Sequence, residues 1–362
     1  MVRAFGFLIV GCSLTLFGDL QSSTVTKPDP LLGDRIVRAL VFQGRLFLQG
    51  APRTRTGPSQ VLVSLDVGSG YKQVHFSKGV IAIEPAGNGL WVLHRAPSGS
   101  SLLIAELRDG KFEDRYSFTP SSSDVPFALL DLGDAPAILS ARTLRIFSAD
   151  GHLSRSVKLQ GKFRNGVQVS TAAPAQADYI YVGFNVGEWG GGLQRVDLKT
   201  GSINSVERRD TNKLCAGPLN GDCDPVTGVI PDSTKPGCVL ASVGLVHMGM
   251  SDGRILRVCG NNVSVVWQKA SKGGFDGTLN VTEAVFGLAK APDGGFWAIT
   301  DGALHRFAPD GTPKNEYPLP KLERVSGIYL SRDVPGAIVV LTDVNWAVST
   351  SGYTPLLAPL DK

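Results

Sequence analysis

The stretch Val285–Leu319, VFGLAKAPDGGFWAITDGALHRFAPDGTPKNEYPL, contains four short runs of β-favouring residues that are separated by turn residues. The turns lie at Pro292–Gly295, Asp301–Gly302 and Asp310–Gly311, and an Asp-Gly pair between two such runs is a strong hairpin signal. Four strands joined in this way form an antiparallel meander. A single meander cannot bury both of its faces, so the stretch predicts that similar units pack beside it.

The opening of this stretch, a valine followed by small and aliphatic residues, occurs seven times along the chain. The openings begin at Val37, Val80, Val125, Val167, Val226, Val285 and Val325, and they lie 43, 45, 42, 59, 59 and 40 residues apart. Periods of about 40 to 50 residues are typical of propeller blades, and closing such sheets radially leaves only short edges. The sequence therefore predicts an all-β fold, a seven-bladed β-propeller of four-stranded antiparallel blades, with the fourth and fifth repeats enlarged.

The unit at Val285 also resembles the bacterial propeller repeats of the NHL and two-component-regulator type. The resemblance rests on its aliphatic opening, on PDGGFWAIT and on the FAPDG turn. It covers residues 285–319 well and the other repeats weakly. The resemblance implies a propeller with a binding role, and it implies no catalytic residue because those families share none.

The predicted propeller domain covers residues 36–362 and follows an export leader at 1–18 and a connecting tail at 19–35. A basic start and a short apolar run are typical of a signal peptide, and the run is too short to span a membrane. Ile9–Cys12 resembles a bacterial lipobox, in which Cys12 would be lipidated. The apolar residues after Cys12 are unlike the usual polar tether, so cleavage without lipidation is an alternative. A disordered or strand-like N-terminus that is not a leader is another.

The charge balance of the chain excludes one class of partner. The formal net charge is +4, and the basic residues are scattered along the sequence. Nucleic-acid binding usually needs a dense basic patch, so we expect no nucleic-acid partner. We expect contact with a membrane only through a lipid at Cys12, and a monomeric protein in the periplasm, in the cell envelope or outside the cell.

Four cysteines remain in the body of the chain, at Cys215, Cys223, Cys238 and Cys259. Four cysteines allow three pairings. Cys238 begins the second strand of the fifth repeat and Cys259 ends its third strand, so the two fall at the same end of an antiparallel hairpin. The register therefore predicts a Cys238–Cys259 disulfide and a Cys215–Cys223 disulfide. Zinc is the rival interpretation, but the chain contains no C-x-x-C pair.

Strand direction sorts the loops of a meander into two sets. The connection between the second and third strands and the connection to the next blade emerge on one face, here called the top face. The long loops gather there, at residues 187–192, 208–225, 245–252 and 269–283. Loops longer than closure requires are common sites of binding on a rigid scaffold.

These top-face loops supply the candidate binding residues, which are Glu188, Trp189, Asp224, His247 and Glu283. Trp189 lies among glycines and has no strand in which to pack, so we expect it to be partly exposed and to anchor a protein or an extended ligand. His247 lies in an apolar stretch, so a structural role is the alternative to a role in binding. The Gly187–Gly192 loop runs into a strand and not into a helix, which disfavours nucleotide binding.

Asp224 and Glu283 each precede the first strand of a repeat, which predicts a position near the mouth of a central channel. Two carboxylates near a histidine could hold a divalent cation or share a proton. We therefore keep two functions open besides a binding or scaffold protein without cofactor. One is a propeller hydrolase, lactonase or lyase with a metal at the channel mouth, and the other is a structural module of an envelope or secretion complex. No common catalytic motif occurs in the chain.

Overall fold

The computed structural model describes most of the chain between Arg35 and Pro359. The described residues are 35–43, 45–51, 61–66, 72–86, 89–132, 136–164, 169–175, 179–213, 215–247, 250–273, 279–291, 293–300, 302–318, 324–330, 337–343 and 353–359. The predicted leader, Cys12 and nearly all of the connecting tail lie outside these residues. Within them, no helix has the length and apolar character needed to cross a membrane.

The chain divides into two compact units, and the first comprises residues 1–85, 89–115 and 322–362. It contains three antiparallel sheets whose strands are neighbours in chain order. The first two sheets have four strands and the third has three within the described residues. The strands are β1 (Arg35–Phe42), β2 (Arg45–Ala51), β3 (Val61–Asp66), β4 (Lys72–Phe76); β5 (Val80–Ala86), β6 (Gly89–Arg95), β7 (Leu102–Arg108), β8 (Lys111–Phe118); and β27 (Arg324–Leu330), β28 (Ala337–Asp343), β29 (Tyr353–Pro359).

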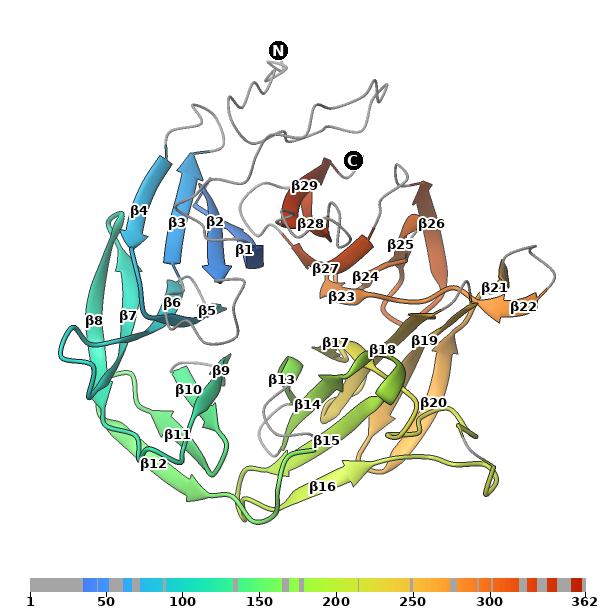
Figure 1. The fold of residues 1–362 in the computed structure, drawn as a ribbon, viewed down its shortest axis with the longest axis horizontal. Coiled ribbons are helices and arrows are strands. Elements are labelled where there is room, and N and C mark those ends of the chain that lie inside the picture. Colours follow the sequence, from blue (N-terminus) through green and yellow to red (C-terminus); the bar gives the residue numbers. More distant parts are fainter. Residues whose placement is uncertain are drawn as a thin grey trace. The chain divides into compact units, whose positions relative to one another are not determined.

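The second unit comprises residues 86–88 and 116–321 and contains four further four-stranded meanders. Their strands are β9 (Pro126–Asp131), β10 (Pro136–Ser140), β11 (Thr143–Phe147), β12 (Leu153–Lys158); β13 (Val169–Ala175), β14 (Tyr179–Asn185), β15 (Gly191–Asp197), β16 (Ile203–Val206); β17 (Val226–Pro231), β18 (Cys238–His247), β19 (Met250–Cys259), β20 (Asn262–Trp267); and β23 (Gly287–Lys290), β24 (Phe296–Ile299), β25 (Ala303–Phe307), β26 (Pro313–Pro318). Each meander coincides with one of the predicted repeats, and Figure 1 labels its strands.

The hydrophobic core of each unit lies between consecutive sheets. In the second unit, Tyr181 and Leu193 of one sheet pack with Val239 and Leu256 of the next, and Leu240 and Phe296 join the following pair. In the first unit, Phe47 packs across to the sheet of β5–β8. Within each unit, consecutive sheets thus bury faces against one another, as the repeat predicts for stacked meanders.

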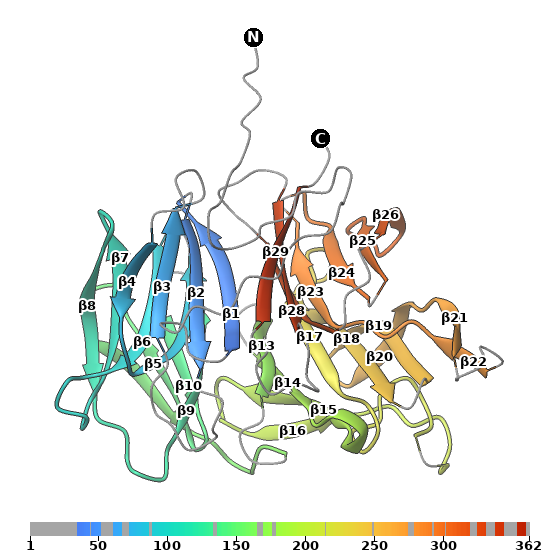
Figure 2. The same cartoon turned by 45° about the horizontal axis from the view of Figure 1, so that its top comes forward.

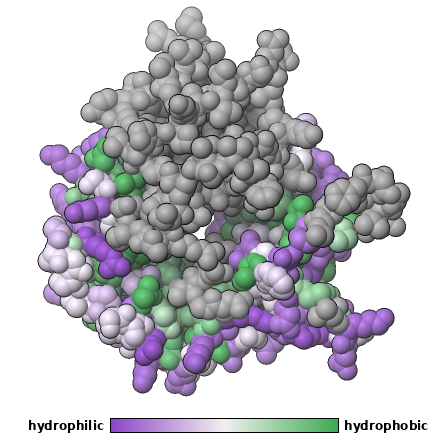
Figure 3. All heavy atoms as spheres, in the orientation of Figure 1, coloured by the Kyte–Doolittle hydropathy of each residue, from purple (hydrophilic) through white to green (hydrophobic). Residues whose placement is uncertain are grey.

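Burial also changes across a sheet, from the first strand to the last. The middle strand β10 is buried at every position, whereas the outer strand β12 is exposed at five of its six residues. Hydrophilic residues predominate along the lower edge of Figure 3, where Figure 1 places β12 and β16, and hydrophobic residues appear there only in small groups. The outer strands therefore form the solvated rim of these sheets.

The fifth repeat is enlarged by long strands and by an extra hairpin. β18 and β19 have ten residues each, and the pairing continues to His247 opposite Met250. After β20 the chain forms the two-stranded hairpin of β21 (Ala270–Gly273) and β22 (Leu279–Thr282). This hairpin projects beside the β17–β20 sheet in both views (Figures 1 and 2).

Candidate functional site

Glu188 and Trp189 lie on η2 (Gly187–Trp189), a single 3-10 turn that connects β14 to β15. Backbone hydrogen bonds close the turn, from Val186 N to Gly190 O at 2.9 Å and from Gly190 N to Gly187 O at 3.0 Å. Trp189 is 73% exposed, which makes it the most exposed large hydrophobic residue of the described part of the chain. Such exposure is unusual for a large amphipathic ring, and it is typical of a side chain that anchors an interface.

The glycines after Trp189 fix the position of this turn against the segment before β17. Gly191 N donates to Gly221 O at 3.0 Å, and Gly192 N donates to Asp224 O at 2.8 Å. A Cβ atom on Gly190 would lie only 2.5 Å from the backbone carbon of Asp222. Gly190 and Gly192 therefore allow close backbone packing against the segment 221–224.

His247 lies at the end of β18 and contacts the same turn. Its Nε2 atom is 3.0 Å from Oε2 of Glu188, and both side chains are about two-fifths exposed. Met250, 46% exposed, lies directly opposite His247 in the β18–β19 register, so the two share a face of the sheet. We call Glu188, Trp189, His247 and Met250 the Trp189 surface. This exposed contact, which is an ion pair when His247 is protonated, links the turn to the hairpin and contributes little to stability.

The insertion between β16 and β17 is held at many points. Arg208 and Leu219 form an antiparallel bridge, and a disulfide joins Cys215 to Cys223. Leu219 is fully buried in the core between the β13–β16 and β17–β20 sheets. The exposed Asp222 accepts from Arg209 at 2.9 Å and also pairs with Arg164. The insertion is thus an ordered part of the domain.

A second disulfide joins Cys238 to Cys259. The two residues are directly opposite in the β18–β19 register, at the end of the hairpin away from His247 and Met250. Both disulfides are the pairs that the repeat register predicts. The sequence separation is 8 for Cys215–Cys223 and 21 for Cys238–Cys259.

Asp224, which the sequence predicts near the mouth of a central channel, is buried in the structure. Its carboxylate is 4% exposed, accepts from Arg254 Nη2 at 2.6 Å and accepts from Asn220 N at 2.7 Å. Burial raises the pKa of Asp224, while the Arg254 guanidinium acts in the opposite direction. Asp224 therefore stabilises the insertion from within and is not available to a partner at the surface.

Glu283 is also placed differently from the expectation. It follows the β21–β22 hairpin, and its side chain points to residues of the outer strands of the next sheet. Lys269 Nζ lies 3.0 Å from Glu283 and 2.9 Å from Glu316 of β26, and the buried His305 of β25 lies 3.4 Å from Glu283. Glu283 thus belongs to an ionic cluster of its own, separate from the Trp189 surface. Among the described residues, no three His, Cys, Asp or Glu side chains are arranged to hold a metal ion.

The Glu283 cluster predicts a pH-dependent contribution to stability. Burial alone would raise the pKa of Glu283, but His305 and Lys269 outweigh it and lower the pKa. A carboxyl with a depressed pKa stabilises the fold above its unfolded pKa, and this contribution is lost as the pH falls through the folded value. We expect Glu283→Gln to cost about 1–2 kcal/mol at pH 7 and progressively less below about pH 5 in urea unfolding. The exposed Glu113→Gln is the control, and an equal loss at both pH values would contradict the prediction.

Several residues of these clusters were not identified from the sequence, among them three on β19. Met250, Asp252 and Arg254 alternate along β19 and therefore share one face, which is the face of His247. The alternation was a usable signal. The partners of Arg254 were not readable in this way, because Asp224 lies 30 residues earlier in an irregular segment.

No protein-family model and no curated protein sequence matches the chain. Solved structures do match. The extracellular domain of the putative hybrid two component system BT4673 from B. thetaiotaomicron aligns over 91% of this chain with 14% identity and a TM-score of 0.54. YCF48 from Cyanidioschyzon merolae aligns over 91% of this chain and 96% of its own, with 10% identity and a TM-score of 0.53. A structure of YCF48 bound to D1 peptide aligns with 12% identity over 91% and 93% of the two chains and a TM-score of 0.51.

The present chain spans 38% of the length of the BT4673 structures. At these identities the likeness establishes the fold and leaves activity and partners open. The seven antiparallel meanders of the described residues and the similarity to these structures agree with the prediction from the repeats. The chain is a β-propeller protein of the seven-bladed, all-β class.

Proposed function

We propose that this chain is an exported β-propeller that binds another protein through the Trp189 surface and has no chemistry of its own. The observation that supports binding most directly is the exposure of Trp189, at 73%, on a backbone that hydrogen bonds hold in place. A partner that covers this ring buries its apolar surface. Because the loop is already ordered, binding carries no further entropic cost of ordering it. Glu188 and His247 supply a polar rim beside the ring, and Met250 extends its apolar part.

The proposal includes export for two reasons. The leader pattern at residues 1–18 is typical of a signal peptide. Two disulfides persist best in an oxidising compartment such as the periplasm or the cell exterior. In this proposal the protein acts as a monomer in the envelope, with a lipid on Cys12 where the lipobox is used, and the YCF48 structure with a bound peptide illustrates the kind of ligand that such a fold can take.

The test is the capture of envelope proteins by purified wild-type protein and by Trp189→Ala. We expect the variant to bind the captured partner at least roughly 30-fold more weakly, because removing a central aromatic anchor costs about 2 kcal/mol or more. We expect its melting temperature to change by less than about 2 °C, because the ring leaves no cavity in the core.

Leu153→Ala is the matched control, since Leu153 is a large exposed hydrophobic residue, 48% exposed, on the outer strand β12. It should leave capture unchanged. Equal capture by the wild type and Trp189→Ala would refute the binding role of this surface. A large fall in melting temperature would instead assign Trp189 to packing.

A further inference from the structure

Carboxylates accompany the apolar side chains of the Trp189 surface. Glu188 precedes Trp189 on η2, and its side chain is well exposed. Asp252 lies two residues after Met250 on the same face of β19, at a spacing of roughly 7 Å, and its side chain is about half exposed. Both elements that form the surface thus present a carboxylate to solvent.

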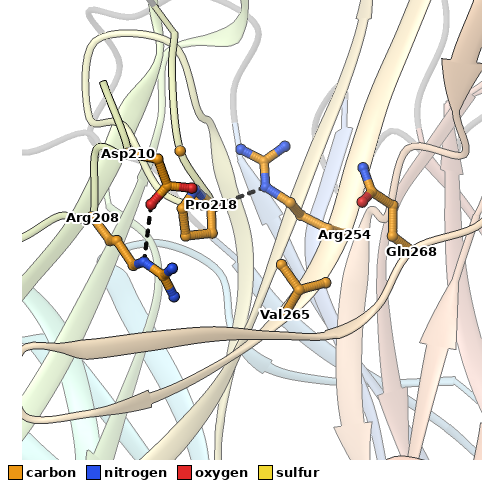
Figure 4. A pocket seen from close by; sticks show the side chains of 7 residues that line it. Arg208, Asp210, Pro218, Arg254, Val265 and Gln268 are labelled. Atoms are coloured by element: carbon orange, nitrogen blue, oxygen red, sulfur yellow. Dashed lines mark hydrogen bonds and ion pairs between the residues drawn. The ribbon is translucent and has the colours of Figure 1, made fainter. Parts of the chain in front are cut away.

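The charge of Asp252 is only partly offset. Nη1 of Arg254 donates to it at 2.8 Å, but Nη2 of the same guanidinium donates to the buried Asp224 at 2.6 Å, so one cation serves two carboxylates. Figure 4 shows this guanidinium in the pocket that the insertion and β20 line, where its Nε atom donates to Pro218 O at 2.7 Å. The Arg254 side chain is buried, so solvent meets the carboxylate of Asp252 and not the guanidinium.

The charge of Glu188 is offset only by a histidine. Nε2 of His247 lies 3.0 Å from the carboxylate of Glu188. An imidazole neutralises a carboxylate only while it is protonated, and the protonated fraction of an ordinary imidazole is small well above about pH 6.5. At neutral and alkaline pH, Glu188 therefore keeps its charge beside the ring of Trp189.

The neighbouring ionic network is balanced within itself. The backbone of Asp222 packs against Gly190, and its carboxylate pairs with Arg164 and Arg209. Glu207 pairs with the same two arginines. Two cations thus meet two carboxylates in this network, and the described charged side chains on and beside the Trp189 surface carry a net negative charge.

An exposed tryptophan beside carboxylates favours a cationic partner. The face of an indole ring carries the negative part of its quadrupole, and it attracts a guanidinium or an ammonium group within about 6 Å of the ring centre. A planar guanidinium can stack on the ring and donate to a carboxylate at the same time. An acidic partner would meet like charges, and a purely apolar partner would bury carboxylates without giving them a donor.

We propose that the partner presents a basic segment to the Trp189 surface, with an arginine stacked on Trp189 and paired with Glu188. An apolar residue next to this arginine lies against Met250, and Asp252 attracts further basic residues of the segment. This inference rests on the proposed function, because it names the chemistry of the partner at the same surface.

The test follows the indole N–H signal of Trp189 by NMR while the isotope-labelled protein is titrated with two peptides at about pH 7.5. The chain has five tryptophans, and the signal that is missing in Trp189→Phe identifies Trp189. The probes are N-acetyl-Gly-Arg-Leu-Gly-amide and the same peptide with citrulline, which keeps the shape of arginine without its charge. We expect the arginine peptide to bind with a Kd on the order of 1 mM and the citrulline peptide to bind at least about fivefold more weakly, since the attraction to the ring and the pairing with Glu188 are both lost.

One variant and one control locate the charge that the arginine meets. Glu188→Gln should weaken the arginine peptide about threefold and leave the citrulline peptide unchanged, a difference that a purely structural role of Glu188 would not produce. Glu113→Gln removes the same charge from an exposed residue of the outer strand β8 and should have no effect on either peptide. Equal binding of the two peptides, or a Trp189 signal that does not respond to the arginine peptide, would overturn the inference.

The proposed function and this inference fail in different ways. Loss of envelope-protein capture in Trp189→Ala together with equal binding of the two peptides would mean that the surface binds a protein through apolar contact alone. Unchanged capture in Trp189→Ala would refute the proposed function, and the basic segment with it.

Discussion

Replacing Arg254 with methionine should lower the free energy of unfolding by about 3–5 kcal/mol, the usual cost of breaking a buried ion pair from one side. The change leaves the buried carboxylate of Asp224 without its cation and leaves Pro218 O without its donor. The loss should shrink as the pH falls, because a protonated Asp224 needs no cation. Urea unfolding followed by intrinsic fluorescence at pH 7 and pH 5 measures both effects.

The double variant Arg254→Met with Asp224→Asn is the informative control. It removes both charges while the asparagine oxygen still accepts from Asn220 N, as the carboxylate does at 2.7 Å. We expect it to recover a large part of the stability, since replacing both members of a buried pair is often close to neutral. A loss below about 1 kcal/mol in the single variant would show that this ion pair does not stabilise the insertion.

Gly191→Ala should be comparably destabilising, with a loss of at least about 3 kcal/mol. Gly191 has a φ of +141°, which a residue with a Cβ atom rarely adopts, and the added carbon would lie 2.0 Å from Phe184 O. Both obstacles belong to the backbone of the β14–β15 hairpin, so no side-chain rotation relieves them. Thermal and urea unfolding of the purified variant provide the measurement.

Gly302→Ala is the matched control, because a Cβ atom there meets nothing within 4 Å. It should change stability by less than about 0.5 kcal/mol. Near-equal stabilities of the two variants would mean that the turn bearing Trp189 rearranges easily, which would also weaken the case for a preorganised surface.

The fold was predictable from the sequence because its information is local and repeated. Turn residues such as Asp310–Gly311 mark the end of a strand within a few positions, and the valine openings recur at the start of each sheet. The same register placed Cys238 opposite Cys259. The exposure of Trp189 followed from its glycine neighbours, which offer no strand in which to bury the ring.

The surroundings of the two carboxylates could not be predicted in this way. Their position next to a strand was correct, but the direction of each side chain depends on segments without a periodic pattern. Asp224 turns inward because Arg254 offers a partner that lies far away in sequence. Glu283 turns toward Lys269 because a hairpin, β21–β22, brings residues 269 and 283 together.

The buried position of Leu219 determines how this protein can be altered. An insertion of this length between two strands would ordinarily be the first segment to shorten in protein engineering, because surface loops tolerate deletion. Here Leu219 is fully buried between the β13–β16 and β17–β20 sheets. A shortened version would open a void between the two sheets, so the insertion has to be redesigned together with the core it fills.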